Sequence, residues 1–151
     1  MQQPDTPIVR TWWPLIAWMS VIFLFSTDPF SSSHTSSILG PLLASLLPSL
    51  TIEDIDFIHV IVRKLGHWCE YFILARLLMG VITGQFPLWN SSRQFLLSLV
   101  LAILYAAGDE WHQSFVPSRS ASLFDVLIDC FGALCGALWF ERCKQNPDQS
   151  E

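Results

Sequence analysis

The fold of this chain is decided by the stretch FLLSLVLAILYAAGDEWHQSFVPSRSASLFDVLIDCFGALCGALWF, which covers residues 95–140. Two apolar segments, Phe95–Ala107 and Leu123–Phe140, flank a polar run that begins with Asp109 and Glu110. We interpret both segments as parts of membrane helices. Ionisable side chains at the edge of a membrane segment are costly and need a structural or functional reason. The stretch therefore predicts a membrane protein with a polar site at one membrane face.

The composition indicates one membrane domain that covers residues 1–151. Of the 151 residues, 52% are hydrophobic and only 14% are charged. Tryptophan residues cluster near the segment ends, where amphipathic rings settle at headgroup depth. The net charge of −5 comes without a basic stripe that could neutralise phosphates, so we expect no nucleic-acid partner.

The cysteines and histidines lack the spacing of a metal site. Cys130 and Cys135 lie on one predicted helix, and Glu110-Trp111-His112 does not have the HExxH spacing. We expect no bound metal and no cofactor, and we interpret the cysteines as small apolar filler. The four are Cys69, Cys130, Cys135 and Cys143.

Hydropathy predicts an all-α, polytopic membrane protein with about four transmembrane helices. The expected helices cover residues 12–27, 67–86, 94–110 and 123–141, and a polar tail covers residues 142–151. The first helix is short for a span of about 20 residues, and we interpret it as an uncleaved anchor.

The first loop is expected to hold one or two short interfacial helices. Residues 38–47 are apolar but few, which favours a re-entrant or surface helix. Thr51 suits the N-cap of a second helix, with acidic residues in its first turn. Residues 51–65 place apolar and charged side chains on opposite helix faces, which predicts an amphipathic helix in the interface. This helix could run on past Gly66 into the next segment.

The basic residues predict that both termini are cytoplasmic and that the polar run faces outward. Short cytoplasmic loops are enriched in Lys and Arg. In this orientation the inside holds Arg10, Arg93, Arg142 and Lys144, and the outside holds Arg63, Lys64 and Arg119.

Helical spacing brings polar residues of two helices to the same membrane side. Lys64, His67 and Tyr71 form one stripe, with Glu70 beside His67. The end of the following helix carries a second polar face, which consists of Tyr105, Asp109 and Gln113 with Glu110 and His112 to either side.

The last predicted helix carries two carboxylates and two glycines on one face. These residues are Asp125, Asp129, Gly132 and Gly136. The glycines form a small-xxx-small pattern, which lets a neighbouring helix approach closely. We therefore expect both carboxylates to look into the bundle rather than toward lipid.

Together these faces predict a polar site, and the alternative is a structural network of ion pairs that joins the helix ends. Three chemistries suit the residues: ligands for a divalent metal, an acid/base pair at His67, or an anion site at Lys64 and Arg119. The predicted site consists of Lys64, His67, Glu70, Tyr71, Asp109, Glu110, Gln113, Arg119, Asp125 and Asp129, with Gly132 and Gly136 as helix-packing residues.

In two sequence blocks the chain resembles the VanZ-like family of small bacterial membrane proteins, relatives of a teicoplanin-resistance protein. The first block is RKLGHWCEY at residues 63–71, and the second is DEWHQSFVPSR at residues 109–119. The second block continues into Asp125–Asp129 and Gly132–Gly136, and Phe25-Ser26 resembles the first loop of the family. The chain departs from the family at Ser118, where glycine is usual, and at Arg76.

The resemblance implies a multi-pass protein of the bacterial inner membrane with a role in the cell envelope. Our leading hypothesis is a protein that binds an anionic lipid or cell-wall precursor at its outer face, with a role in envelope integrity or glycopeptide resistance. One alternative is a membrane-embedded hydrolase or transferase that uses Asp109, Glu110 and His67. Another is an accessory scaffold that docks other membrane proteins through its glycine faces.

Overall fold

All regular structure in the described part of the chain is helical. The computed structural model describes residues 8–27, 40–43, 45–117 and 121–145. The all-α class is therefore confirmed for these residues. In the first loop, residues 40–43 and 45–46 are also helical. The long helices are α1 (Ile8–Phe25), α3 (Ile52–Gln85), α4 (Ser91–Gln113) and α5 (Leu123–Gln145).

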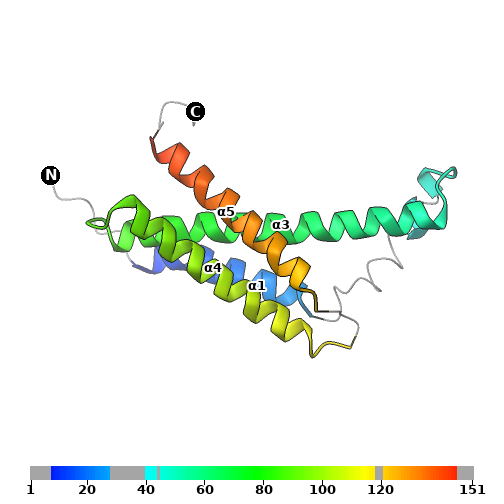
Figure 1. Ribbon diagram of the computed structural model, residues 1–151, viewed down its shortest axis with the longest axis horizontal. Helices are drawn as coiled ribbons and strands as arrows, with labels where there is room; N and C mark the ends of the chain where they lie inside the picture. The colour runs from blue at the N-terminus through cyan, green and yellow to red at the C-terminus, as the bar shows by residue number, and fades with distance from the viewer. Residues whose placement is uncertain (1–7, 28–39, 44, 118–120, 146–151) are drawn as a thin grey trace.

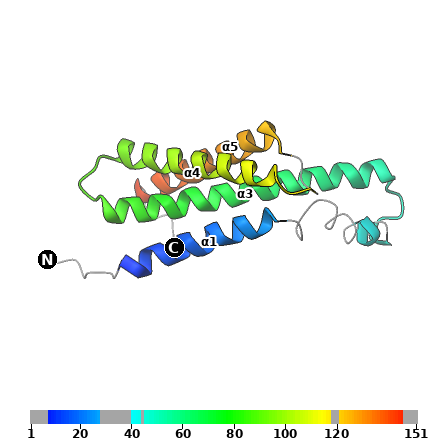
Figure 2. The ribbon, with the colours of Figure 1, turned by 90° about the horizontal axis from the view of Figure 1, so that it is seen from below.

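The central helix is α3, which packs against α1, α4 and α5, while α4 also packs against α5. Figure 1 shows α1 and α4 running in one direction along the bundle and α3 and α5 in the other. The first turn of α1 and the last turn of α5 therefore lie at the same end. Figure 2 shows α1 on one side of α3 and α5 on the other.

The amphipathic segment and the membrane segment that follows it form one continuous helix, α3. Thr51 is its N-cap and forms a capping box, in which its hydroxyl accepts a hydrogen bond from the Asp54 backbone N–H at 3.2 Å. The helix does not stop at Gly66, and its 34 residues make it about 51 Å long. This length exceeds the thickness of a hydrocarbon core, which is about 30 Å. The N-terminal part of α3 extends past the other helices of the bundle (Figure 1). Of the two arrangements that the sequence left open, the structure has the one in which the amphipathic segment continues past Gly66.

The other helices are also longer than the sequence predicted. Asn90 caps α4 by accepting a hydrogen bond from the Arg93 backbone N–H at 2.9 Å. From there α4 continues to Gln113, so the first part of the polar run is helical. Similarly, α5 continues through residues 142–145, which we had assigned to the tail.

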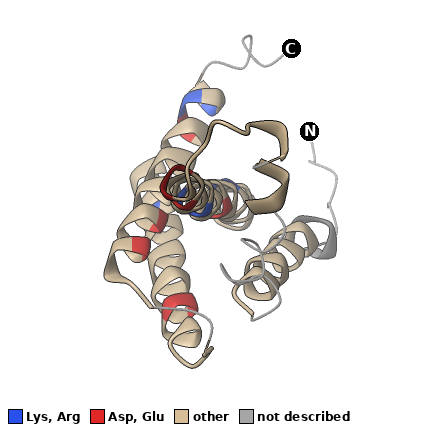
Figure 3. Cartoon of the chain, turned by 90° about the vertical axis from the view of Figure 1, so that its right-hand side faces the viewer, with Lys and Arg blue, Asp and Glu red and all other residues tan. Residues whose placement is uncertain are grey.

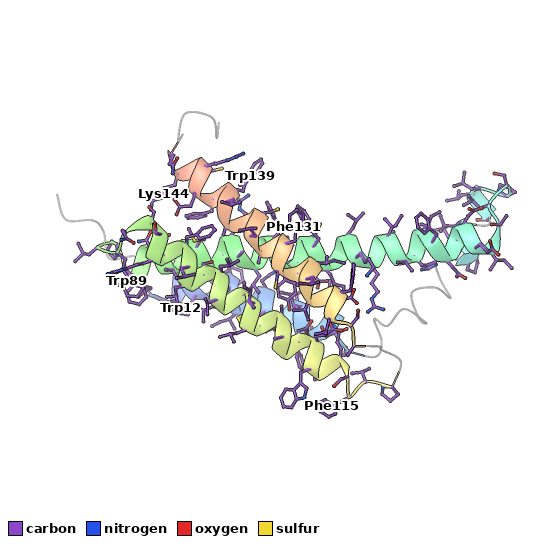
Figure 4. All side chains as sticks on the ribbon, viewed as in Figure 1. Trp12, Trp89, Phe115, Phe131, Trp139 and Lys144 are labelled. Carbon is purple, nitrogen blue, oxygen red and sulfur yellow. The ribbon has the colours of Figure 1, made fainter. Side chains whose placement is uncertain are left out.

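Three helices, α3, α4 and α5, are long and apolar enough to cross a membrane. The apolar part of α1, Trp12–Phe25, is shorter, so a count of four spans stays a prediction. Figure 3 shows that most of the helical ribbon is formed by residues other than Lys, Arg, Asp and Glu. In Figure 4, Trp12, Trp89 and Trp139 lie toward one end of the bundle and Phe115 lies at the other, as expected for aromatic belts.

Small residues of α5 allow it to approach α3 closely. Ala133 and Ala137 of α5 are fully buried. A Cβ added to Gly132 would lie 3.1 Å from the carbonyl carbon of Trp68, and one added to Gly136 would lie 2.9 Å from that of Phe72. The two backbones therefore touch, and α5 is held at a fixed height along α3.

We expect Gly136→Ala to lower the free energy of unfolding by about 1–3 kcal/mol, because the new methyl group must push α5 away from the α3 backbone. The matched control is Gly84→Ala, since nothing lies within 4 Å of a Cβ at that position. Thermal unfolding in detergent micelles would measure both. Equal melting temperatures for the two variants would contradict the close approach.

Candidate functional site

Four helices contribute buried polar side chains to one end of the bundle. This group, here called the polar layer, combines residues from the end of α1, the middle of α3, the end of α4 and the start of α5. All of them are at most 7% exposed. The polar layer consists of Ser26, His67, Tyr71, Asp109, Glu110, Gln113, Asp125 and Asp129.

A single carboxylate of the polar layer holds two cations. Arg63 Nη2 donates to Asp125 Oδ2 at 2.8 Å, and Lys64 Nζ donates to Asp125 Oδ1 at 2.9 Å. The Asp125 side chain is 4% exposed, whereas those of Arg63 and Lys64 are 26% and 38% exposed. The two basic side chains therefore cover the carboxylate and reach the surface.

The prediction of the site from sequence missed Arg63. Adjacent residues on a helix point about 100° apart, so helical spacing placed Arg63 off the Lys64 stripe. The arginine side chain is long enough to reach Asp125 in spite of this difference in direction. The available signal was the adjacent basic pair itself.

A histidine–aspartate pair joins α3 to α5 one turn deeper. His67 Nδ1 lies 3.1 Å from Asp129 Oδ1, and both side chains are buried. Our sequence-based enzyme hypothesis paired His67 with Asp109 and Glu110, but the carboxylate that contacts its ring is Asp129. The charge of Glu70 also acts on His67, and its backbone carbonyl accepts a hydrogen bond from Trp18 Nε1 of α1 at 2.9 Å.

A second cluster ties α1 to the end of α4. Ser26 Oγ donates to Asp109 Oδ1 at 2.6 Å, and Gln113 Nε2 donates to Asp109 Oδ2 at 3.1 Å. Ser26 was also missing from the predicted site. The signal for it was the family-like dipeptide Phe25-Ser26, since neither spacing nor charge distinguishes a serine at the end of an apolar helix.

Glu110 and Tyr71 lie between these two clusters. Glu110 Oε1 accepts a hydrogen bond from the Ser122 backbone N–H, which fastens the start of α5 to the end of α4. Its charge interacts with those of His67 and Asp129. The charges of Asp109 and Asp129 both act on the Tyr71 hydroxyl. The polar layer is thus electrostatically continuous from α1 to α5.

Several buried atoms of the polar layer have spare hydrogen-bonding capacity. Within the described ranges, Tyr71 Oη, Glu110 Oε2, Gln113 Oε1 and Asp129 Oδ2 are buried without a hydrogen-bond partner. Buried polar atoms in native proteins are normally paired with protein, ordered water or a ligand. The layer can therefore accept and donate further hydrogen bonds.

The structure leaves one predicted site residue undescribed, and it bears on the possibility of a metal site. Arg119, which we predicted as a site residue, and Ser118 lie outside the described residues. In the part of the chain that the structure covers, no three His, Cys, Asp or Glu side chains are grouped so that they could hold a metal ion.

We expect Ser26→Ala to lower the free energy of unfolding by about 1–3 kcal/mol, because it leaves a buried Asp109 oxygen without its donor. The control on the same helix is Ser20→Ala, whose exposed hydroxyl donates only to its own helix, at Ile16 O. Thermal unfolding in micelles would compare them. A Ser26 variant as stable as the Ser20 variant would show that the bond to Asp109 does not hold α1.

The comparison with known proteins agrees with the two sequence blocks that supply the polar layer. The family model described as VanZ/LLP1 matches residues 11–144, which include every residue of the layer. Neither the curated proteins nor the solved structures gave a match. Since the family match covers most of the chain and α3, α4 and α5 are apolar and long enough to cross a bilayer, the chain is a membrane protein that belongs to the VanZ/LLP1 family.

Proposed function

We propose that this protein binds the anionic headgroup of a lipid or a lipid-linked cell-envelope intermediate beside the polar layer. The observation that carries the proposal is the sharing of one carboxylate, that of Asp125, by Arg63 and Lys64. One negative charge neutralises one of the two cations, which leaves a net positive charge on a partly exposed pair. A phosphate group is the natural counterion for such a pair.

Both basic side chains keep donors for a ligand. Lys64 has three N–H donors, of which one is directed at Asp125. Arg63 bonds Asp125 through one N–H of Nη2, and its side chain is 26% exposed, so the rest of the guanidinium fork can face a ligand, although its Nε is buried. A guanidinium fork beside an ammonium group matches the geometry of phosphate oxygens.

The surface around the basic pair suits the rest of a lipid. Lys64 Nζ lies 5.6 Å from the centroid of the Phe124 ring. Phe124, Leu123 and Leu127 are 68%, 86% and 63% exposed. A charged group bordered by exposed apolar side chains is the arrangement expected where headgroups meet the hydrocarbon core.

The proposal includes a topology, in which the single domain spans the inner membrane four times with both termini in the cytoplasm. The direction of the four helices supports it, because the start of α1 and the end of α5 lie at the same end of the bundle (Figure 1). The polar layer then faces the outer side, where a role in envelope integrity or glycopeptide resistance would be exerted. Reporter fusions after Phe86 and Val116 test this, and a cytoplasmic Val116 would overturn it.

We expect the wild-type protein to bind phosphatidylglycerol at least tenfold more tightly than phosphatidylcholine. Lys64→Gln combined with Arg63→Gln should abolish this preference, since a tenfold loss corresponds to only about 1.4 kcal/mol. Asp125→Asn should strengthen binding, because it removes the carboxylate that competes with the phosphate. Native mass spectrometry of the protein with each lipid measures the three affinities.

Arg76→Gln is the matched control, because this arginine lies farther along α3 and its guanidinium faces the Phe72 ring. It should leave the preference for phosphatidylglycerol unchanged. Equal binding of both lipids by the wild type would refute the proposal. So would a double variant that folds, as shown by its melting temperature, and still prefers the anionic lipid.

A second candidate function, a membrane-embedded hydrolase or transferase, is favoured by the buried His67–Asp129 pair with Glu110 in electrostatic range. Such a pair holds an imidazole in one orientation for proton transfer. Incubation with a lipid extract tests it, with mass spectrometry as the readout. A lipid species converted by the wild type but not by a folded Asp129→Asn variant would support catalysis, and no conversion by the wild type would count against it.

The scaffold hypothesis loses its main support. The Gly132–Gly136 face is occupied by α3 of the same chain, so it is not free to dock another protein. The other glycine face of this hypothesis consists of Gly80 and Gly84. A Cβ at Gly80 would contact Phe140 of α5, whereas nothing lies within 4 Å of a Cβ at Gly84, so this position stays open to a partner.

A further inference from the structure

A groove runs along α1 where this helix faces α4. It has a volume of about 440 Å³, which lies within the range of about 300–1,000 Å³ for ligand pockets. The groove is open on one side, where Ile16 and Phe23 are 59% and 48% exposed. Its lining consists of Ile16, Met19, Ser20, Phe23 and Leu24 of α1 and Tyr105 of α4.

The walls of the groove offer nothing to a polar ligand. The Ser20 hydroxyl donates to Ile16 O at 2.9 Å, and the Tyr105 hydroxyl donates to Met19 O at 2.7 Å. Among the residues that the structure describes, no charged side chain lines the groove. Because both hydroxyl groups are engaged with the α1 backbone, the remaining surface is apolar and suits a hydrocarbon.

The groove has the length of one bilayer leaflet and a polar end. From Ile16 to Leu24 it covers nine residues of α1, or about 12 Å along the helix axis. The hydrocarbon core of one leaflet is about 15 Å deep. Ser26 lies two residues beyond Leu24 and Asp109 lies one turn beyond Tyr105, and the two form a hydrogen bond of the polar layer. One end of the groove therefore lies near polar groups and the other end lies in the apolar interior. An acyl chain likewise extends from a polar ester group into the hydrocarbon core.

We infer that this groove holds one acyl chain of a bilayer phospholipid, with its ester end toward Ser26 and Asp109. The groove opens sideways on the lipid-facing surface, where phospholipids are the surrounding solvent. Its residues come from α1 and α4, and it shares none with the basic pair on α3. The acyl-chain site is therefore independent of the proposed headgroup site, and either can be wrong without the other.

The experiment is a count of the phospholipids that remain bound after purification. The protein is expressed in a bacterial host, washed with excess detergent and measured by native mass spectrometry. We expect at least one phospholipid per wild-type chain. In the double Arg63/Lys64 variant, which lacks the proposed headgroup site, adding Ser20→Trp, whose indole fills the groove, should lower the occupancy at least fivefold. Leu24→Trp blocks the same groove from the next turn and is a second test if the first variant does not fold.

The matched control is Leu104→Trp, an exposed position on α4 that does not line the groove, which should keep the lipid. The double Arg63/Lys64 variant should also keep it, which separates this site from the headgroup site. No retained lipid in the wild type would overturn the inference. Equal retention by the groove and control variants would do the same, and a retained polyprenyl lipid alone would replace the phospholipid as occupant.

Discussion

The close contact between the backbones of α5 and α3 is the constraint on which the rest of the molecule depends. Gly132 lies against Trp68 and Gly136 against Phe72, so the two helices are held in one register and cannot slide. Since both run in the same direction, this register places Asp129 opposite His67 and Asp125 opposite the basic pair. The two glycines deeper in the bundle therefore position the polar contacts at the membrane face.

The arrangement separates buried from accessible charge. Asp109 and Asp129 are buried, and each is held by hydrogen bonds from a second helix, which offsets the cost of a carboxylate near hydrocarbon. Arg63 and Lys64 remain partly exposed at the rim, where a long aliphatic chain can lie against apolar surface while the charge reaches the headgroups. A ligand that approaches from the membrane face thus meets the cations first.

The sequence was sufficient for the helical class and for the face of α5 that turns inward, because both follow from periodicity. It was insufficient where local signals are weak. Gly66 has open space around it and costs α3 only about 1 kcal/mol, so the helix passes through a residue that looked like a boundary. Ser26 and Arg63 could not be predicted as site residues, because their roles depend on which helices pack next to them. Their partners are 83 and 62 residues away in the sequence, and no local pattern encodes such a distance.

The attachment of α1 differs in kind from that of α5. Where α5 packs backbone against backbone, α1 is tied at two heights by side-chain hydrogen bonds. In its middle they run from Trp18 to Glu70 O and from Tyr105 to Met19 O, and at its end from Ser26 to Asp109. In hydrocarbon no water competes for these donors and acceptors, so the bonds fix the position of α1. The Tyr105 side chain reaches from α4 to the α1 backbone at Met19 and also forms part of the wall of the groove. The same contact that anchors α1 therefore borders the space that a lipid chain can occupy.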